Sequence, residues 1–190
     1  MEGKKAMINL KRVLFLLVIL SVGLFLWMDQ EQNKMRDGAA TRAALPQVGH
    51  PAPDFILPDM TEAEEIGLAE IIQEGQGAIV YFWTSWCPFC AASMKALEEA
   101  HKDYGENIHF LGINVTSQDS VSAAEKFTDK HGITFRNLMD VEGSVSKAYY
   151  VPPVPTALFI NSEGIIIHRK VGALTTQELE RTIKQFGGSN

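Results

Sequence analysis

The strongest constraint on the fold is the segment Trp86-Cys87-Pro88-Phe89-Cys90, which contains both cysteines of the chain. It follows an apolar run at 78–83 and precedes a stretch rich in helix-forming residues. A cysteine at a helix start faces unpaired backbone N–H groups and the positive end of the helix dipole, which stabilise a thiolate. The second cysteine lies one turn further on, within reach to close a disulfide, and proline suits the first helical position. The segment therefore predicts a redox dithiol.

Two other roles for the cysteines were weighed against this one. A structural disulfide at this spacing closes a very small loop and constrains the unfolded chain little. A structural zinc site usually needs four Cys or His ligands, and the five histidines are scattered without ligand spacing. We therefore expect no metal site and no cofactor. The histidines are His50, His101, His109, His131 and His168.

The N-terminus carries a second strong signal. An uncharged stretch at 13–28 follows a basic segment, and its length lies between those of a secretion signal and a typical spanning helix. No convincing small-x-small cleavage site follows it, so we favour an uncleaved transmembrane anchor over a cleaved signal peptide. Basic residues on the leading side place 1–12 in the cytoplasm and the domain at 50–190 outside the cell membrane. Residues 29–49 are then a polar tether.

The charge of the chain excludes some partners. Four basic residues and one acid lie in 1–28, so the remainder has 13 basic and 22 acidic residues and a formal charge of −9. Such an acidic surface argues against nucleic acid and anionic lipid headgroups as partners.

Periodicity and turn residues predict an α/β domain with a central mixed sheet and helices on both faces. The run at 79–83 does not alternate, which indicates a strand buried on both sides. Thr175 and Glu178 have the spacing of a capping box at the last helix. The other expected elements are an edge strand in 52–59, helices at 68–73, 88–104, 121–131 and 145–150, and strands at 108–114, 134–139, 156–160 and 165–170.

Several motifs together resemble the thioredoxin superfamily, and within it the membrane-tethered TlpA/ResA-like thiol–disulfide oxidoreductases of bacteria. The resemblance covers residues 50–187, and the elements at 121–139 resemble the αβ insertion of these proteins. The matching motifs are Ala52-Pro53-Asp54-Phe55, the segment from Tyr81 to Cys90, Val154-Pro155-Thr156, the turn Asn161-Ser162-Glu163-Gly164, and Gly172.

The resemblance implies a role for each matching residue. Cys87 would be the nucleophile that forms a mixed disulfide, and Cys90 the thiol that resolves it. Pro155 would be a cis-proline whose loop pairs with the substrate main chain, and a cis bond is cheap before proline. Trp86 would shield the sulfurs and contact substrate. The expected substrate-binding residues are Trp86, Pro88, Val154 and Pro155.

Two positions depart from the family. Thioredoxins carry a buried acid where this chain has Tyr81, and several ResA-like relatives carry a glutamate where it has Ser93. The usual acceptors of the Cys90 proton are therefore missing, and water, Glu142 or Glu163 would take that role. We hypothesise that the Cys90 thiol has a high pKa.

The direction of electron flow is open, because potentials on this fold run from about −270 to −120 mV. The resemblance favours a monomeric reductase of disulfides in exported proteins, apocytochrome c being the family's best-known substrate, with electrons from a membrane thiol donor. The alternative is a disulfide-forming oxidase of secreted proteins.

The sequence partly matches two further activities. Thr84 and Cys87 match part of a peroxiredoxin site, but Val80 stands where such a site needs proline. Copper(I) delivery would use the two thiolates, with His168 as the late histidine, although its surroundings are more typical of a surface strand end.

Overall fold

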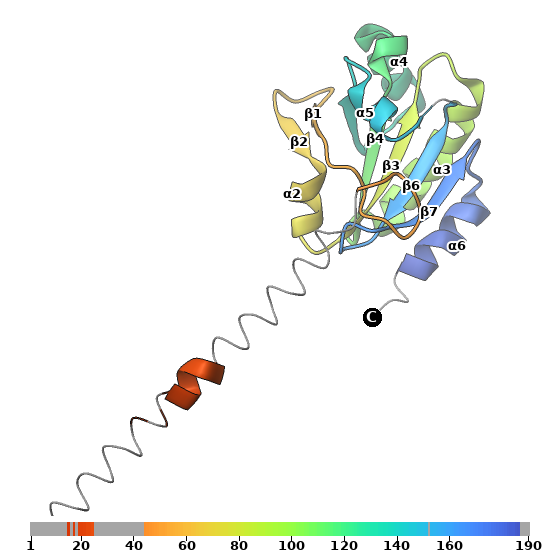
Figure 1. Cartoon of the computed structure of the whole chain (residues 1–190). Coiled ribbons are helices and arrows are strands. Elements are labelled where there is room, and N and C mark those ends of the chain that lie inside the picture. Colours follow the sequence, from red (N-terminus) through yellow and green to blue (C-terminus); the bar gives the residue numbers. More distant parts are fainter. Residues whose placement is uncertain (1–14, 16, 18, 25–43, 152, 187–190) are drawn as a thin grey trace, which may run out of the picture. The chain divides into compact units, whose positions relative to one another are not determined.

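The structure, a computed structural model, describes residues 15, 17, 19–24, 44–151 and 153–186 (Figure 1). The chain divides into two units, Met1–Ala43 and Ala44–Asn190. The described residues of the first unit are helical and exposed. Half of the expected anchor at 13–28, all of 1–12 and residues 29–43 of the expected tether lie outside the described residues. Within the part of the chain that the structure describes, no helix is long and apolar enough to cross a membrane.

The second unit is built on a five-stranded mixed sheet in the order β5-β4-β3-β6-β7. The pairs β3–β4 and β4–β5 are parallel, whereas β3–β6 and β6–β7 are antiparallel. This is the predicted thioredoxin-like arrangement. The strands are β3 (Gly77–Trp83), β4 (Ile108–Asn114), β5 (Arg136–Met139), β6 (Thr156–Ile160) and β7 (Ile166–Val171).

Helices cover both faces of this sheet, as predicted. Buried side chains of α3 (Pro88–Tyr104), α4 (Val121–His131) and α6 (Thr176–Phe186) belong to one core cluster. Those of α2 (Leu68–Gln73) and α5 (Ser144–Ala148) belong to the other.

Strand β3 separates the two clusters, and its whole length is buried. Ile79, Tyr81 and Trp83 face the first cluster, which also contains both cysteines. Ala78, Val80 and Phe82 face the second. Successive side chains of a strand point to opposite faces, so an unbroken apolar run is what a strand between two cores requires.

Local signals set several helix ends where the sequence predicted them. The Ser120 hydroxyl accepts from the backbone N–H of Ala123 at 3.2 Å and begins α4. Gly132 ends α4 with φ +61°, a conformation that favours glycine. At α6, Glu178 N–H donates to the Thr175 hydroxyl and Thr175 N–H donates to the Glu178 carboxylate, both at 3.2 Å. The predicted capping box is confirmed.

The expected edge strand at 52–59 is a correction. Only β1 (Ile56–Pro58) forms there, and it pairs with β2 (Glu65–Gly67) in a separate two-stranded sheet. A single bridge, Asp59 to Leu138, reaches the main sheet. Strands of three residues carry too little periodicity to be found from sequence.

The folded unit also begins earlier than the predicted boundary at residue 50. Gly49 N–H donates to the Ile166 carbonyl at 2.8 Å, and the Arg169 guanidinium donates to the Pro46 carbonyl at 3.0 Å. Residues from Ala44 onward therefore belong to the compact unit rather than to a tether.

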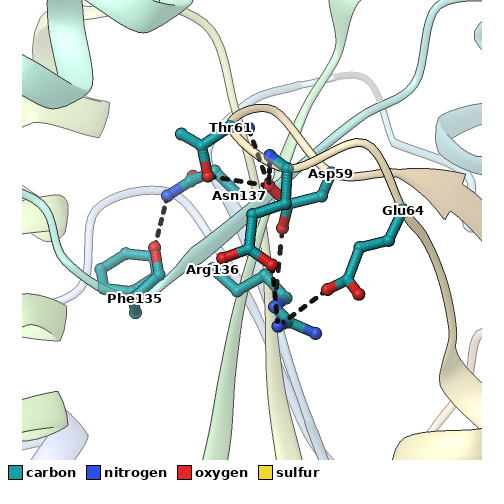
Figure 2. A network of polar contacts seen from close by, with 7 residues as sticks. Asp59, Thr61, Glu64, Phe135, Arg136 and Asn137 are labelled. Carbon is teal, nitrogen blue, oxygen red and sulfur yellow. Dashed lines mark hydrogen bonds and ion pairs between the residues drawn. The ribbon is translucent and has the colours of Figure 1, made fainter.

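A polar network attaches the loop after β1 to β5 (Figure 2). The Arg136 guanidinium lies 3.0 Å from the Glu64 carboxylate and 3.5 Å from that of Asp59. Asp59 in turn accepts from the backbone N–H of Thr61 at 2.7 Å. The loop between β1 and β2 is thereby fixed to β5, a strand that is distant in sequence and lies at the edge of the main sheet.

The next residue of β5 connects this edge to the strand that precedes the dithiol. The Trp83 indole N–H donates to Asn137 Oδ1 at 3.0 Å, and Asn137 Nδ2 donates to the Phe135 carbonyl at 2.8 Å. Gly112 of β4 lies between these strands. A Cβ at Gly112 would overlap the Asn137 carboxamide and lie 3.1 Å from Trp83 Nε1, so glycine makes room for the bond.

We predict that Gly112→Ala lowers the free energy of unfolding by roughly 1–3 kcal/mol, the usual cost of overpacking a core. Adding Asn137→Ala should restore part of this loss, because the overlap is then removed. Urea denaturation of the two single variants and the double variant measures the coupling. Additive losses would show that the carboxamide does not crowd residue 112.

Candidate active site

The two cysteines form a disulfide at the start of α3. Cys87 is the N-cap residue, and its Sγ accepts from the backbone N–H of Cys90 at 3.2 Å. Pro88 occupies the first helical position, as predicted. Both cysteines are buried, Cys87 with 4% of its surface exposed and Cys90 with none. The roles of attacking and resolving thiol stay predictions.

Two exposed aromatic side chains flank Cys87. Trp86 is 60% exposed and Phe89 is 66% exposed, while Pro88 between them is also exposed. The indole N–H of Trp86 donates to the Gln118 carbonyl at 3.0 Å, which orients the ring. Together these residues give the surface next to the sulfur an apolar character. Phe89 was not among the predicted substrate contacts.

The Val154–Pro155 peptide bond is cis, as predicted. In the antiparallel register Thr156 lies opposite Phe82. Pro155 therefore lies beside the C-terminal end of β3, which the dithiol follows. Pro155 is buried, and half-buried Val154 packs against the cluster that contains both cysteines. Pairing of this loop with a substrate main chain stays a prediction.

Behind Cys90 lie two hydroxyl groups. The Tyr81 hydroxyl donates to the Cys90 carbonyl at 3.4 Å. The Ser93 hydroxyl donates to the Phe89 carbonyl at 3.1 Å and accepts from the Leu174 N–H at 2.8 Å. Burial raises the pKa of Tyr81 well above its ordinary value, and a hydrogen bond with Ser93 offsets only part of this. Tyr81 is therefore neutral at physiological pH.

Sequence reasoning missed the carboxylate that binds the residues before the dithiol. Asp119 accepts from the backbone N–H and the hydroxyl of Ser85. These residues are separated by 34 positions. In the sequence, an aspartate directly before the cap residue Ser120 is typical of a solvent-exposed turn, so its position gave no sign of a role at the dithiol.

The comparisons with known proteins agree with this geometry. A family model described as the AhpC/TSA family matches residues 48–169, well over half of the chain. The chain belongs to the AhpC/TSA family. Thiol-disulfide oxidoreductase ResA of Halalkalibacterium halodurans is 31% identical over 138 residues, which cover 72% of this chain and 76% of that protein. Thioredoxin-like protein YneN of Bacillus subtilis is 29% identical and covers 88% of this chain and 94% of its own.

Solved structures place the same fold in related enzymes. StoA from Bacillus subtilis matches with a TM-score of 0.60 and 26% identity, covering 73% of this chain and 98% of that structure. A secreted Mycobacterium tuberculosis disulfide oxidoreductase homologous to Escherichia coli DsbE matches with a TM-score of 0.61 and 27% identity, covering 69% and 95%. This AhpC/TSA member is a thioredoxin-like thiol-disulfide oxidoreductase of the ResA and StoA type.

The fold separates the two acids suggested as acceptors of the Cys90 proton. Glu163 lies in the turn after β6. Because β6 runs antiparallel to β3, this turn lies beside the N-terminal end of β3, whereas the dithiol follows its C-terminal end. Glu163 therefore does not serve Cys90, which corrects that suggestion. Glu142 follows the C-terminal end of β5, which points the same way as that of β3. However, β5 is two strands from β3, and Glu142 is exposed.

The histidine considered for copper delivery is also placed away from the sulfurs. His168 pairs with Phe159 within the sheet, with ring centroids 5.4 Å apart. Phe159 in turn lies opposite Ile79, near the start of β3, whereas the dithiol follows its end. Among the described residues, no three His, Cys, Asp or Glu side chains gather in a metal-binding arrangement.

We predict that the thiol of Cys90, in a Cys87→Ser variant, titrates above the ordinary cysteine pKa of about 8.5, because burial disfavours the thiolate. The matched Cys90→Ser variant should leave Cys87 titrating below about 8.5, since a helix start stabilises its thiolate. Thiolate absorbance against pH measures both values. A Cys90 pKa at or below that of Cys87 would contradict the assignment of roles.

Proposed function

We propose that this enzyme is a reductase that keeps cysteines of exported proteins in the thiol form. The observation that carries the proposal is the placement of the two cysteines, with Cys87 as the N-cap residue at the helix start and Cys90 fully buried. The ResA relative is named a thiol-disulfide oxidoreductase, which supports thiol–disulfide exchange as the reaction. Apocytochrome c is the substrate that the family resemblance favours.

The reaction follows from the positions of the sulfurs. The Cys87 thiolate attacks one sulfur of a substrate disulfide, forming a mixed disulfide and releasing the other substrate sulfur as a thiolate. Cys90, after losing its proton, attacks Cys87 Sγ and releases the second substrate thiol. The substrate gains two electrons, and the enzyme ends in the Cys87–Cys90 disulfide. A membrane thiol donor must then return two electrons to the enzyme.

The surroundings of Cys90 favour the reducing direction. A dithiol is a strong oxidant when its reduced form is stabilised. Here the Tyr81 hydroxyl, which is neutral, donates to the Cys90 carbonyl, and burial disfavours a thiolate at Cys90. The reduced form is therefore poorly stabilised, which lowers the potential.

We expect the reduction potential of a fragment beginning at Ala44 to lie below about −220 mV, in the range of reductases. Trp83, buried beside the dithiol, and the exposed Trp86 provide a fluorescence signal for titration in thiol buffers. A value above about −150 mV would make the enzyme a disulfide-forming oxidase and would overturn the reductase proposal.

We propose further that the catalytic unit lies outside the cytoplasm, held by an anchor at 13–28. The basic residues before this apolar stretch support that orientation. The catalytic unit acts as a monomer, and its substrates reach Cys87 beside the exposed Trp86 and Phe89.

We predict that alkaline phosphatase fused after Asn190 is active in cells, because it needs an oxidising compartment to form its disulfides. The matched fusion that begins at residue 44 should be inactive. Carbonate extraction of the full fusion should leave it in the membrane fraction, whereas a cleaved signal would release it. Equal activity with and without 1–43 would refute the proposed orientation.

A further inference from the structure

The two residues before Cys87 are held by the connection between β4 and α4, which includes the short helix η1 (Thr116–Gln118). The Ser85 backbone N–H donates to Asp119 Oδ2 at 2.6 Å, and the Ser85 hydroxyl donates to Asp119 Oδ1 at 2.7 Å. The adjacent Gln118 carbonyl accepts from the Trp86 indole. One turn of the chain thus binds both residues that lead into the dithiol.

Asp119 is itself fixed to the sheet. Asn114, the last residue of β4 and fully buried, donates from Nδ2 to Asp119 Oδ2 at 2.9 Å. The Thr116 hydroxyl donates to Asn114 Oδ1 at 2.9 Å and orients that amide. Ser120 N–H donates to Asp119 Oδ1 at 2.9 Å. The carboxylate is therefore a rigid link between the end of β4 and the segment before Cys87.

The charge of Asp119 suits this link. Burial raises the pKa of Asp119, but the hydrogen bonds from Ser85, Asn114 and Ser120 outweigh this effect and hold the pKa below its ordinary value. The group is an anion at neutral pH, and hydrogen bonds to an ionised acceptor are stronger than those between neutral groups.

The link bears on Cys87 through the backbone. Cys87 has the extended conformation of an N-cap residue, with φ −86° and ψ 110°, and its N–H donates to the Thr84 carbonyl at 3.3 Å. This conformation aims Sγ at the Cys90 N–H. Release of Ser85 would free the backbone two residues before Cys87 and weaken that alignment.

We propose that Asp119 is a positioning residue for thiol–disulfide exchange. By binding both donors of Ser85, it holds Cys87 Sγ at the start of α3, where a thiolate is stabilised. The inference rests on the proposed role of Cys87 as the attacking thiol. A purely electrostatic role has the opposite sign, because a nearby negative charge disfavours a thiolate.

The test uses the full chain with Cys90→Ser, in which Cys87 is the only thiol. The rate of iodoacetamide alkylation between pH 4 and 9 gives the pKa of Cys87. Asp119→Ala should raise this pKa and slow alkylation at pH 6 by roughly 3- to 10-fold, the size of effect seen at helix ends. Ser85→Ala should act in the same direction but less, since the backbone N–H bond remains.

Asp140→Ala is the matched control. Asp140 is a buried carboxylate at the same sheet edge that accepts from Val145 N–H at 3.2 Å and Ser146 N–H at 2.8 Å. Its loss should lower the melting temperature without moving the Cys87 pKa, because its side chain binds the start of α5. Thermal melts of every variant separate positioning from general destabilisation.

An unchanged or lowered Cys87 pKa in Asp119→Ala overturns the inference. If Asp119→Ala does not fold, the same result in Ser85→Ala overturns it. A parent Cys87 pKa at or above about 8.5 would instead contradict the proposed function itself. A low parent pKa that is insensitive to both substitutions overturns the positioning role alone.

Discussion

The structure depends on the burial of β3 between two cores. Each residue of Gly77–Trp83 is buried, with alternate side chains in alternate clusters. Apolar burial contributes about 25 cal/mol per Å², so a strand packed on both faces is among the most strongly held parts of a domain. Only residues 84–86 separate this strand from Cys87. Because the end of β3 is held in place, the conformation of these residues decides where the sulfur of Cys87 lies.

Three chain segments meet beside the C-terminal end of β3, and the strand directions explain why. β4 runs parallel to β3, so the turn that carries Gln118 and Asp119 leaves the sheet beside the dithiol. β6 runs antiparallel to β3, so the loop with Val154 and Pro155, which precedes β6, lies at the same end of β3. Parallel and antiparallel neighbours on the two sides of one strand are thus what assemble the site.

Much of this arrangement was predictable because its signals are local. The buried run, the helix after Cys87 and the capping box at Thr175 each depend on neighbouring residues. The cis bond before Pro155 was expected from the family resemblance of a short motif. The β1–β2 hairpin escaped prediction because each strand has three residues. Asp119 escaped because its partner Ser85 is 34 positions away, and nothing near Asp119 distinguishes it from a solvated turn acid.

The polar groups around the two cysteines are arranged unequally, and the proposed order of the exchange reaction rests on this inequality. On the side of Cys87, an anionic carboxylate from the next loop binds the preceding backbone, and the helix N–H groups face the sulfur. On the side of Cys90, the hydroxyls of Tyr81 and Ser93 donate to carbonyls of the first turn of α3, and burial keeps Tyr81 neutral. Under the proposed roles, ionisation is favoured at Cys87, at the helix start, and opposed at the fully buried Cys90. The proposed enzyme would then attack with the first thiol and give up the proton of the second with difficulty, so the mixed disulfide would persist until a base reaches Cys90.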